Sequence, residues 1–308
     1  MIEAQGVSKR YGAVWALNDV SLRAPEGSVV GLLGQNGAGK TTLLRIMTGY
    51  LAATSGQVLI GGADPLLSPM EAKSRLGYMP EHPPLYDEMT VWEYLCFVSR
   101  LKGVCPGAVR DHVRELMELT GLADRRDRLL GHLSKGYRQR AGLAQALSGD
   151  PEVLILDEPT SGLDPKQITE IRRLMKELSN RRTILFSSHM LSEVQQLCDH
   201  VVILNRGRVK LDMSLGRLAS VGDAVLLCWI RGRGEELLSA LRRMAGIREV
   251  RIEPAPGPEI TSVTLAFHGA ERPEEALFAL LSGLAMPILR LQRQESSLEQ
   301  VFLDAISE

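Results

Sequence analysis

One glycine-rich segment constrains this chain more than any other feature of its sequence. It begins after the apolar run 28–33, which predicts a buried strand, and it ends where residues 43–47 start a helical pattern. Strand, glycine-rich loop and helix in that order form the context that a phosphate-binding loop requires. The residues of the segment are Gly34, Gln35, Asn36, Gly37, Ala38, Gly39, Lys40, Thr41 and Thr42.

The chemistry of this segment suits a phosphate with a metal ion beside it. Its glycines let successive backbone N–H groups converge on a phosphate, and the helix that follows adds the positive end of its dipole. Lys40 can reach the β- and γ-phosphates of a nucleotide, and the Thr41 hydroxyl is placed to ligate Mg²⁺. An ordinary glycine-rich turn is the alternative, which the flanking strand and helix disfavour.

A second predicted strand carries two acidic residues at its end. Residues 153–156 are all apolar, and Asp157 and Glu158 follow them directly. Apolar runs of this kind mark central parallel strands, and ligands collect beyond the carboxyl ends of such strands. Adjacent carboxylates are costly as structural residues, because like charges repel and burial disfavours both. We therefore expect Asp157 to ligate Mg²⁺ and Glu158 to act on water.

Two further residues each admit a structural role beside a functional one. His189 follows the predicted strand 182–188, so it would share a sheet edge with the two acids and can contact a γ-phosphate or a water molecule. A lone histidine is more often structural. Tyr11 lies between the antiparallel strands predicted at 2–9 and 14–23, where it can stack on a nucleotide base or cover the sheet edge.

A helical insert separates the early and late strands of the predicted sheet. Its first helix starts with a capping box, Thr90 to Glu93, and the helical subdomain spans about residues 85–150. Ser134 can cap the last helix of this subdomain, and the amides around Gly136 would form a second anion-binding end. The alternative for Ser134 is an ordinary helix cap.

A proline-rich loop, residues 80–84, follows the short strand predicted at 75–79. Its three prolines fix an irregular, exposed connection. A rigid loop after a sheet strand can carry a polar group to an active site and can also present a surface to a partner. The polar group in this position is Glu81.

Composition limits the classes of function. The net charge of −1 over 308 residues gives no sign of a nucleic-acid partner. No apolar run approaches the roughly 18 residues of a transmembrane helix, and residues 1–5 lack the features of a signal peptide. Four scattered cysteines favour reduced thiols over disulfides or metal ligands. We expect a cytosolic protein.

The chain beyond residue 220 predicts a smaller domain without catalytic residue types. Its expected order is strand 223–230, helix 234–244, strand 248–253, strand 260–267, helix 272–284, strand 287–292 and a final helix at 297–306. The pattern β-α-β-β-α-β is that of a ferredoxin-like domain. The expected domains are therefore 1–220 and 221–308.

Taken together, the motifs of residues 1 to about 215 resemble the ATP-binding subunit of an ABC transporter. Residues 34–42 resemble its Walker A loop, residues 154–158 its Walker B strand with the catalytic glutamate, and residues 133–140 its signature. Tyr11 resembles its adenine-stacking aromatic residue, Ser161–Asp164 its D-loop, and His189 its switch histidine. The tail at 295–303 is similar to that of the single-domain ATPases of type-2 exporters, of which the bacterial gliding-motility and drug-export proteins are the nearest in pattern.

The resemblance implies a fold. We expect an α/β P-loop NTPase cassette of the ABC type, with a mixed-sheet core, an antiparallel β subdomain and a helical subdomain, followed by the small ferredoxin-like α+β domain.

The resemblance also implies a mechanism. ATP and Mg²⁺ would be bound between two copies of the chain, with Ser134, Lys135 and Gly136 of each copy capping the γ-phosphate held by the other, and Asp164 making contacts across the dimer. Glu158 would polarise water and His189 would align it. A separate integral-membrane permease would be the second partner, which places the chain on the cytoplasmic face of the membrane. The expectation that transport is outward depends on the resemblance of the tail at 295–303 and on the presence of the extra domain.

Three residues depart from the family pattern. The signature has Lys135 where many members have glycine and Tyr137 where many have glutamine, but Ser134 and the Gly136 amide are retained. Glu81 replaces the glutamine of the family's Q-loop. A carboxylate can still ligate Mg²⁺ but, when ionised, cannot donate a hydrogen bond to water. A soluble ABC ATPase that acts on a ribosome or nucleic-acid complex is the alternative function, although such proteins usually carry two cassettes in one chain.

Overall fold

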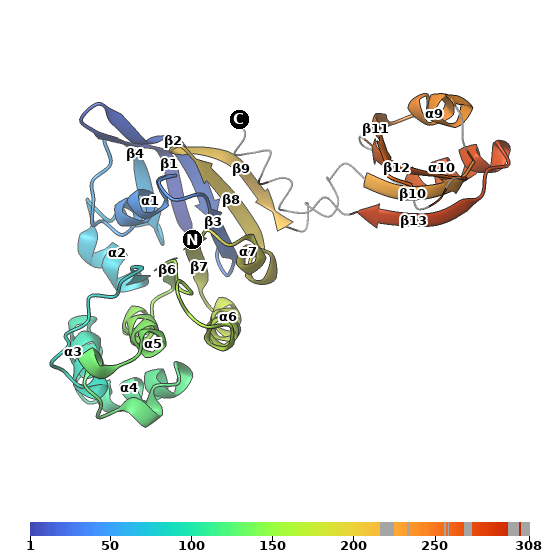
Figure 1. The fold of residues 1–308 in the computed structure, drawn as a ribbon. Coiled ribbons are helices and arrows are strands. Elements are labelled where there is room, and N and C mark those ends of the chain that lie inside the picture. The colour runs from blue at the N-terminus through green and yellow to red at the C-terminus, as the bar shows by residue number, and fades with distance from the viewer. Residues whose placement is uncertain are drawn as a thin grey trace. The chain divides into compact units, whose positions relative to one another are not determined.

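A computed structural model of the protein describes residues 1–215, 225–232, 235–255, 257, 259–267, 273–294 and 302. The chain divides into two compact units, Met1–Leu215 and Gly216–Glu308 (Figure 1), and each is described by itself. The predicted domain boundary at residues 220 and 221 lies outside the described ranges, and so does the predicted final helix apart from Phe302. Both stay predictions.

The first unit is built on a six-stranded sheet with the order β5-β6-β7-β3-β8-β9. Its strands are β3 (Val29–Leu33), β5 (Leu76–Met79), β6 (Val153–Asp157), β7 (Thr183–Ser188), β8 (His200–Asn205) and β9 (Arg208–Ser214). All neighbours are parallel except β8 and β9, which form an antiparallel hairpin. Every residue of β3, β6 and β7 is buried, which explains the apolar runs 29–33, 153–156 and 184–186 within them.

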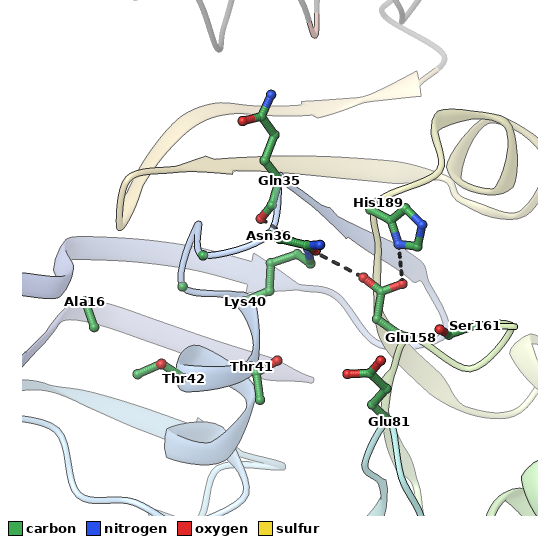
Figure 2. A pocket seen from close by; sticks show the side chains of 12 residues that line it. Ala16, Gln35, Asn36, Lys40, Thr41, Thr42, Glu81, Glu158, Ser161 and His189 are labelled. Atoms are coloured by element: carbon green, nitrogen blue, oxygen red, sulfur yellow. Dashed lines mark hydrogen bonds and ion pairs between the residues drawn. The ribbon is translucent and has the colours of Figure 1, made fainter.

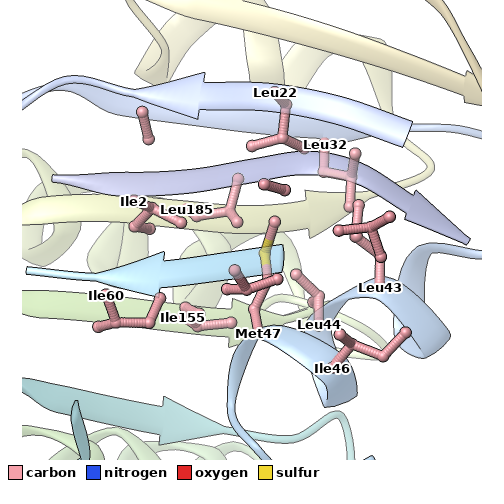
Figure 3. Packing of buried hydrophobic residues seen from close by; sticks show 14 of the residues in the cluster. Ile2, Leu22, Leu32, Leu43, Leu44, Ile46, Met47, Ile60, Ile155 and Leu185 are labelled. Atoms are coloured by element: carbon pink, nitrogen blue, oxygen red, sulfur yellow. The ribbon is translucent and has the colours of Figure 1, made fainter. Parts of the chain in front are cut away.

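A three-stranded antiparallel sheet with the order β2-β1-β4 forms a second layer. Its strands are β1 (Ile2–Tyr11), β2 (Val14–Ala24) and β4 (Ser55–Ile60). The helix α1 (Lys40–Met47) contributes Leu43, Leu44, Ile46 and Met47 to one buried cluster that joins both sheets. Figure 3 shows these side chains facing Ile2 and Ile60 of the antiparallel sheet and Leu32, Ile155 and Leu185 of the larger one. The helix that follows the glycine-rich loop is thus fixed on several sides.

Three helices form the predicted helical subdomain: α3 (Val91–Leu101), α4 (Val109–Leu119) and α5 (Lys135–Leu147). They share a core of their own, which includes Val91, Leu95, Val113 and Met117. The capping box at the start of α3 is confirmed, because Glu93 N donates to Thr90 Oγ1 and Thr90 N donates to the Glu93 carboxylate. The subdomain ends in α5, whose C-terminal end lies against β5 of the large sheet.

Two short helices were not predicted from the sequence. The helix α2 (Pro69–Arg75) buries only Ala72, and α7 (Leu191–Leu197) buries only Glu193 and Val194. Neither segment therefore shows apolar residues repeating every three to four positions, which is the pattern that distinguishes a helix from a loop. The longer α6 (Pro165–Ser179) buries one face. Of the helices that the structure describes, none is long and apolar enough to cross a bilayer.

The second unit contains β10 (Val225–Arg231), α9 (Glu235–Arg242), β11 (Ile247–Glu253), β12 (Ile260–Phe267), α10 (Pro273–Gly283) and β13 (Ile288–Gln294). Its sheet has the order β11-β12-β10-β13, with every neighbouring pair antiparallel. This is the order of a ferredoxin-like domain, with the first and third strands in the centre. Leu237 and Leu277 of the two helices share a buried core with Cys228 and Leu265 of the sheet.

Candidate active site

The site lies where three parallel strands end at one edge of the large sheet. Leu33, the last residue of β3, is paired with Ser188 of β7, and Asp157, the last residue of β6, is paired with Ser187. The glycine-rich loop, the acidic pair and His189 therefore begin next to one another, although they are far apart in the sequence. The sequence prediction that these motifs share a sheet edge is confirmed.

The glycine-rich loop approaches other backbone segments too closely for larger residues. A Cβ atom on Gly34 would lie 2.5 Å from the Leu204 carbonyl oxygen, and one on Gly39 would lie 2.7 Å from that of Ala16. Gly39 also has a φ of 108°, which glycine adopts readily. Lys40 reaches back over the loop, where its Nζ donates to the carbonyl oxygen of Gly34 at 2.7 Å. The backbone of the loop therefore curves around the ammonium group of Lys40.

Glu158 lies between two groups that can carry positive charge (Figure 2). Its Oε1 lies 3.5 Å from Lys40 Nζ and its Oε2 lies 2.8 Å from Nδ1 of His189. The residue is buried to 8% exposure and has a φ of 48°, which is unusual for a residue other than glycine. Backbone strain of this kind persists only where surrounding contacts hold it, and it clusters at active sites. A buried carboxylate with two partners is well placed to orient and polarise water.

Ser187 fixes the acidic pair and was not singled out from the sequence. Its hydroxyl donates to Asp157 Oδ1 at 2.6 Å and accepts a hydrogen bond from Glu158 N at 2.9 Å. The Ser187 hydroxyl therefore fixes the position of the Asp157 carboxylate, which is expected to hold the metal, and of the strained backbone at Glu158. The signal available in the sequence was the pair of serines, Ser187 and Ser188, that ends an otherwise apolar strand directly before His189.

A pocket of about 360 Å³ opens at this edge. Most of the predicted phosphate-loop residues line it, together with the two predicted catalytic residues, and Ala16 and Ser161 contribute to its wall. The lining residues are Ala16, Gln35, Asn36, Gly37, Gly39, Lys40, Thr41, Thr42, Glu81, Glu158, Ser161 and His189. Gly34 and Ala38 belong to the same loop without lining the pocket.

The donor set fits Mg²⁺ bound together with phosphates. Thr41 and Glu81 line the pocket, and the buried Asp157 is paired with Ser187 at the same edge. In the described part of the chain, no group of three or more histidine, cysteine or acidic side chains can hold a metal ion alone. Mg²⁺ commonly uses one or two protein ligands and completes its shell with phosphate oxygens and water. Thr41, Asp157 and Glu81 are therefore a suitable partial set.

Glu81 is held by contacts between its loop and α5. Gln139 Nε2 donates to the Glu81 carbonyl oxygen at 3.1 Å, and a Cβ atom on Gly142 would lie 2.4 Å from Pro83. Figure 2 shows the Glu81 carboxylate pointing toward the space below Glu158. Tyr78 stands three residues before Glu81, and burial, followed by the charge of Asp157, raises the pKa of its hydroxyl to about 12. The loop thus joins the pocket to the helical subdomain.

Besides Gly34, Ala38 and Asp157, five predicted site residues do not line the pocket. Tyr11 lies at the end of β1 with 50% exposure, and Lys9 Nζ lies 5.4 Å from the centre of its ring. Asp164 caps α6 by accepting from Gln167 N. The other three are Ser134, Lys135 and Gly136 at the start of α5. Ser134 occupies the predicted N-cap position and is exposed, but its side chain makes no cap hydrogen bond.

Comparison with known proteins identifies the arrangement. The family model described as "ABC transporter" matches residues 17–161. The linearmycin resistance ATP-binding protein LnrL of Bacillus subtilis is 31% identical over 311 residues, which cover 99% of this chain and 97% of that protein. The chain belongs to the ABC transporter ATP-binding proteins. It is an ATPase whose family couples ATP hydrolysis to transport.

Solved structures agree with this assignment. One described as the ATP-binding subunit of an ABC transporter has a TM-score of 0.66 and 31% identity, and the match covers 71% of this chain and 92% of that one. A dimeric bacterial ABC transporter cassette, MJ0796, has a TM-score of 0.65 and 25% identity, over 70% of this chain and 99% of that one. The predicted ABC cassette fold and ATP binding are confirmed.

Proposed function

We propose that this chain is the ATP-hydrolysing subunit of an ABC exporter and that it works as a head-to-tail dimer with ATP between the two copies. One observation carries the proposal. Lys40, Glu158 and His189 meet in one pocket, whereas Ser134 is exposed outside it with its hydroxyl making no hydrogen bond to the described residues. A single copy therefore offers donors to one side of a γ-phosphate, and a second copy supplies them to the other side.

The residues have distinct roles in this scheme. The backbone of residues 34–39 and the ammonium of Lys40 hold the phosphates, and Tyr11 stacks on adenine. Ser134, Lys135 and Gly136 of the opposite copy cap the γ-phosphate, and Asp164 makes contacts across the dimer. Glu158 polarises the attacking water, while His189 holds Glu158, water and phosphate in line.

Mg²⁺, held by Thr41, Asp157 and Glu81 beside the phosphates, would neutralise part of their charge. Glu81 differs chemically from the glutamine expected at its position, because it adds a negative charge and loses two donors. Its loop is hydrogen-bonded to Gln139 of α5 and would pass changes at the metal to the helical subdomain. We place the permease partner on this subdomain and its Glu81 loop, and we place the chain on the cytoplasmic face of the membrane.

Export is the direction that the relatives favour. LnrL, whose name records resistance to linearmycin, is similar to this chain over nearly the full length of both proteins, including the ferredoxin-like unit. Action on a ribosome or nucleic-acid complex remains the second candidate, but the net charge of −1 gives it no support.

Co-expression and purification with a candidate membrane permease test the proposal. Reconstituted vesicles that contain both proteins are expected to hydrolyse ATP. They are also expected to move a substrate across the membrane, from the side on which ATP is added to the opposite side. ATP hydrolysis without association with any membrane protein would contradict the exporter assignment.

A further inference from the structure

A third buried carboxylate lies behind the site. Glu193, on α7, is 1% exposed and does not line the pocket. Its Oε1 accepts a hydrogen bond from Thr160 Oγ1 at 2.5 Å, and its Oε2 accepts one from Ser188 Oγ at 2.7 Å. Ser188 Oγ in turn accepts from Met190 N at 3.0 Å, so the serine proton is directed to Glu193. Both carboxylate oxygens are therefore occupied by hydroxyl donors.

These two donors come from the two segments that carry the residues acting on water. Thr160 lies two positions after Glu158, and Ser188 immediately precedes His189. Glu193 therefore connects the turn after β6 to the end of β7 at a point beyond the Ser187 contact. Ser187 fixes the start of the turn through Glu158 N, and Glu193 fixes its later part through Thr160.

The turn needs such a connection because Glu158 has a φ of 48°. A residue with a side chain leaves that conformation readily unless neighbouring contacts hold it. The 2.8 Å separation between Glu158 Oε2 and His189 Nδ1 depends on both segments keeping their places. Arg172 of α6 adds a counter-charge, since one of its terminal nitrogens lies 3.8 Å from Glu193 Oε1. The carboxylate thus has partners from α6 and from both segments.

We propose that Glu193 is a positioning residue for ATP hydrolysis: it ties the Glu158 turn to the His189 segment and so sets the geometry of the pair. The inference rests on the proposed roles of Glu158 and His189. Loss of the Glu193 carboxylate leaves Lys40 and the phosphate loop in place, so Glu193 acts on the chemical step and not on ATP binding. Misplacement of a catalytic pair by about 1 Å lowers rates by as much as about 100-fold.

The test measures steady-state ATP hydrolysis, binding of a fluorescent ATP analogue and thermal unfolding for the full-length chain. Glu193→Ala is expected to lower kcat about 10- to 100-fold, with KM and analogue affinity changed less than about 3-fold. Glu193→Gln keeps the shape and one acceptor, so it is expected to retain an intermediate kcat. If Glu193→Ala does not fold, Thr160→Val provides the test, because it removes one hydrogen-bond donor to Glu193 at constant side-chain size. It is also expected to lower kcat. Glu177→Ala, an exposed carboxylate on α6, is the control and is expected to leave kcat unchanged.

A double-mutant cycle separates positioning from general stability. If Glu193 acts through the pair, Glu193→Ala costs less than about 3-fold in kcat once His189→Ala is already present. Equal losses in both backgrounds, an unchanged kcat for both Glu193→Ala and Thr160→Val, or a loss of analogue binding in proportion to kcat would overturn the inference. Full activity of Glu158→Gln would instead contradict the proposed function, so the two failures are distinguishable.

Discussion

His189 Nδ1 lies 2.8 Å from Glu158 Oε2, although 31 positions separate the two residues in the sequence. The contact joins the end of β7 to the turn after β6, and Lys40 approaches the other oxygen of the same carboxylate. An ion pair and a hydrogen bond therefore connect the three groups at the edge of the sheet. Hydrolysis is therefore expected to depend on the His189 ring even where ATP binding does not.

Substitution of His189 by alanine tests this separation. The ring contacts Glu158 and lines the pocket without belonging to the phosphate loop. We expect His189→Ala to lower kcat roughly 100-fold or more while affinity for ATP changes only a few-fold. Single-turnover hydrolysis together with equilibrium nucleotide binding checks this. A parallel loss of both quantities would indicate that the histidine supports the pocket as a whole.

Ser134 and Thr90 provide a matched pair of helix starts. Both occupy N-cap positions, but only the Thr90 side chain accepts a hydrogen bond from its helix. We expect Thr90→Ala to lower the free energy of unfolding by about 1 kcal/mol and Ser134→Ala to change it by less than about 0.5 kcal/mol. In contrast, Ser134→Ala is expected to weaken ATP-dependent dimerisation, which Thr90→Ala leaves intact. Chemical unfolding without ATP and sedimentation with ATP measure the two effects. Reversal of the pattern would mean that Ser134 serves its own helix.

Glu81 is expected to change the response to Mg²⁺. Replacement of a carboxylate by an amide weakens a Mg²⁺ ligand, so Glu81→Gln is expected to raise the Mg²⁺ concentration for half-maximal ATPase activity by roughly 3- to 10-fold. The exposed Glu88 in the same segment does not line the pocket, and Glu88→Gln is the control. An Mg²⁺ titration at saturating ATP checks this, and identical curves for Glu81→Gln and the unmodified chain would remove Glu81 from the metal site.

Alkaline unfolding is expected to depend on Tyr78. Burial, followed by the charge of Asp157, raises the pKa of Tyr78 to about 12, whereas an unfolded tyrosine titrates near 10. Below about pH 10 the residue is protonated in both states, and above it only the unfolded chain releases the proton. Stability is therefore expected to be fully present below about pH 10 and to fall between about pH 10 and 12. Tyr78→Phe is expected to flatten this fall, whereas Tyr50→Phe at an exposed position is not. Urea unfolding at several pH values gives the free energy of unfolding for each variant. If its pH dependence were the same for the unmodified chain and Tyr78→Phe, Tyr78 would not be the group responsible.

The sequence predicted the parts of the fold whose residues form continuous apolar runs or repeat with a clear period. The buried strands β3 and β6, the amphipathic helix α3, and the order of helices and strands along the second unit were accessible in this way. The helix α7 was not, because its buried positions include a carboxylate, Glu193, that no apolar pattern reveals.

The same limit applied to the site. Lys40, Asp157, Glu158 and His189 stand in recognisable motifs, so their convergence was predictable from parallel strands that end at one edge. The contacts that hold them were not. Ser187 and Glu193 act through hydrogen bonds that depend on the three-dimensional path of two loops, and neither stands in a motif of its own. The absence of a cap hydrogen bond between Ser134 and its own helix likewise became visible only once that helix was placed.

In the proposed mechanism, two copies of the chain enclose ATP, with Glu158 behind the phosphate that is transferred. Glu158→Gln keeps the size of the side chain and removes the charge, so hydrolysis is expected to fall roughly 100- to 10,000-fold while ATP stays bound. Light scattering of Glu158→Gln measures this enclosure: we expect the mass of a dimer in saturating ATP and of a monomer without nucleotide. A monomer in saturating ATP, with ATP shown to be bound, would contradict it.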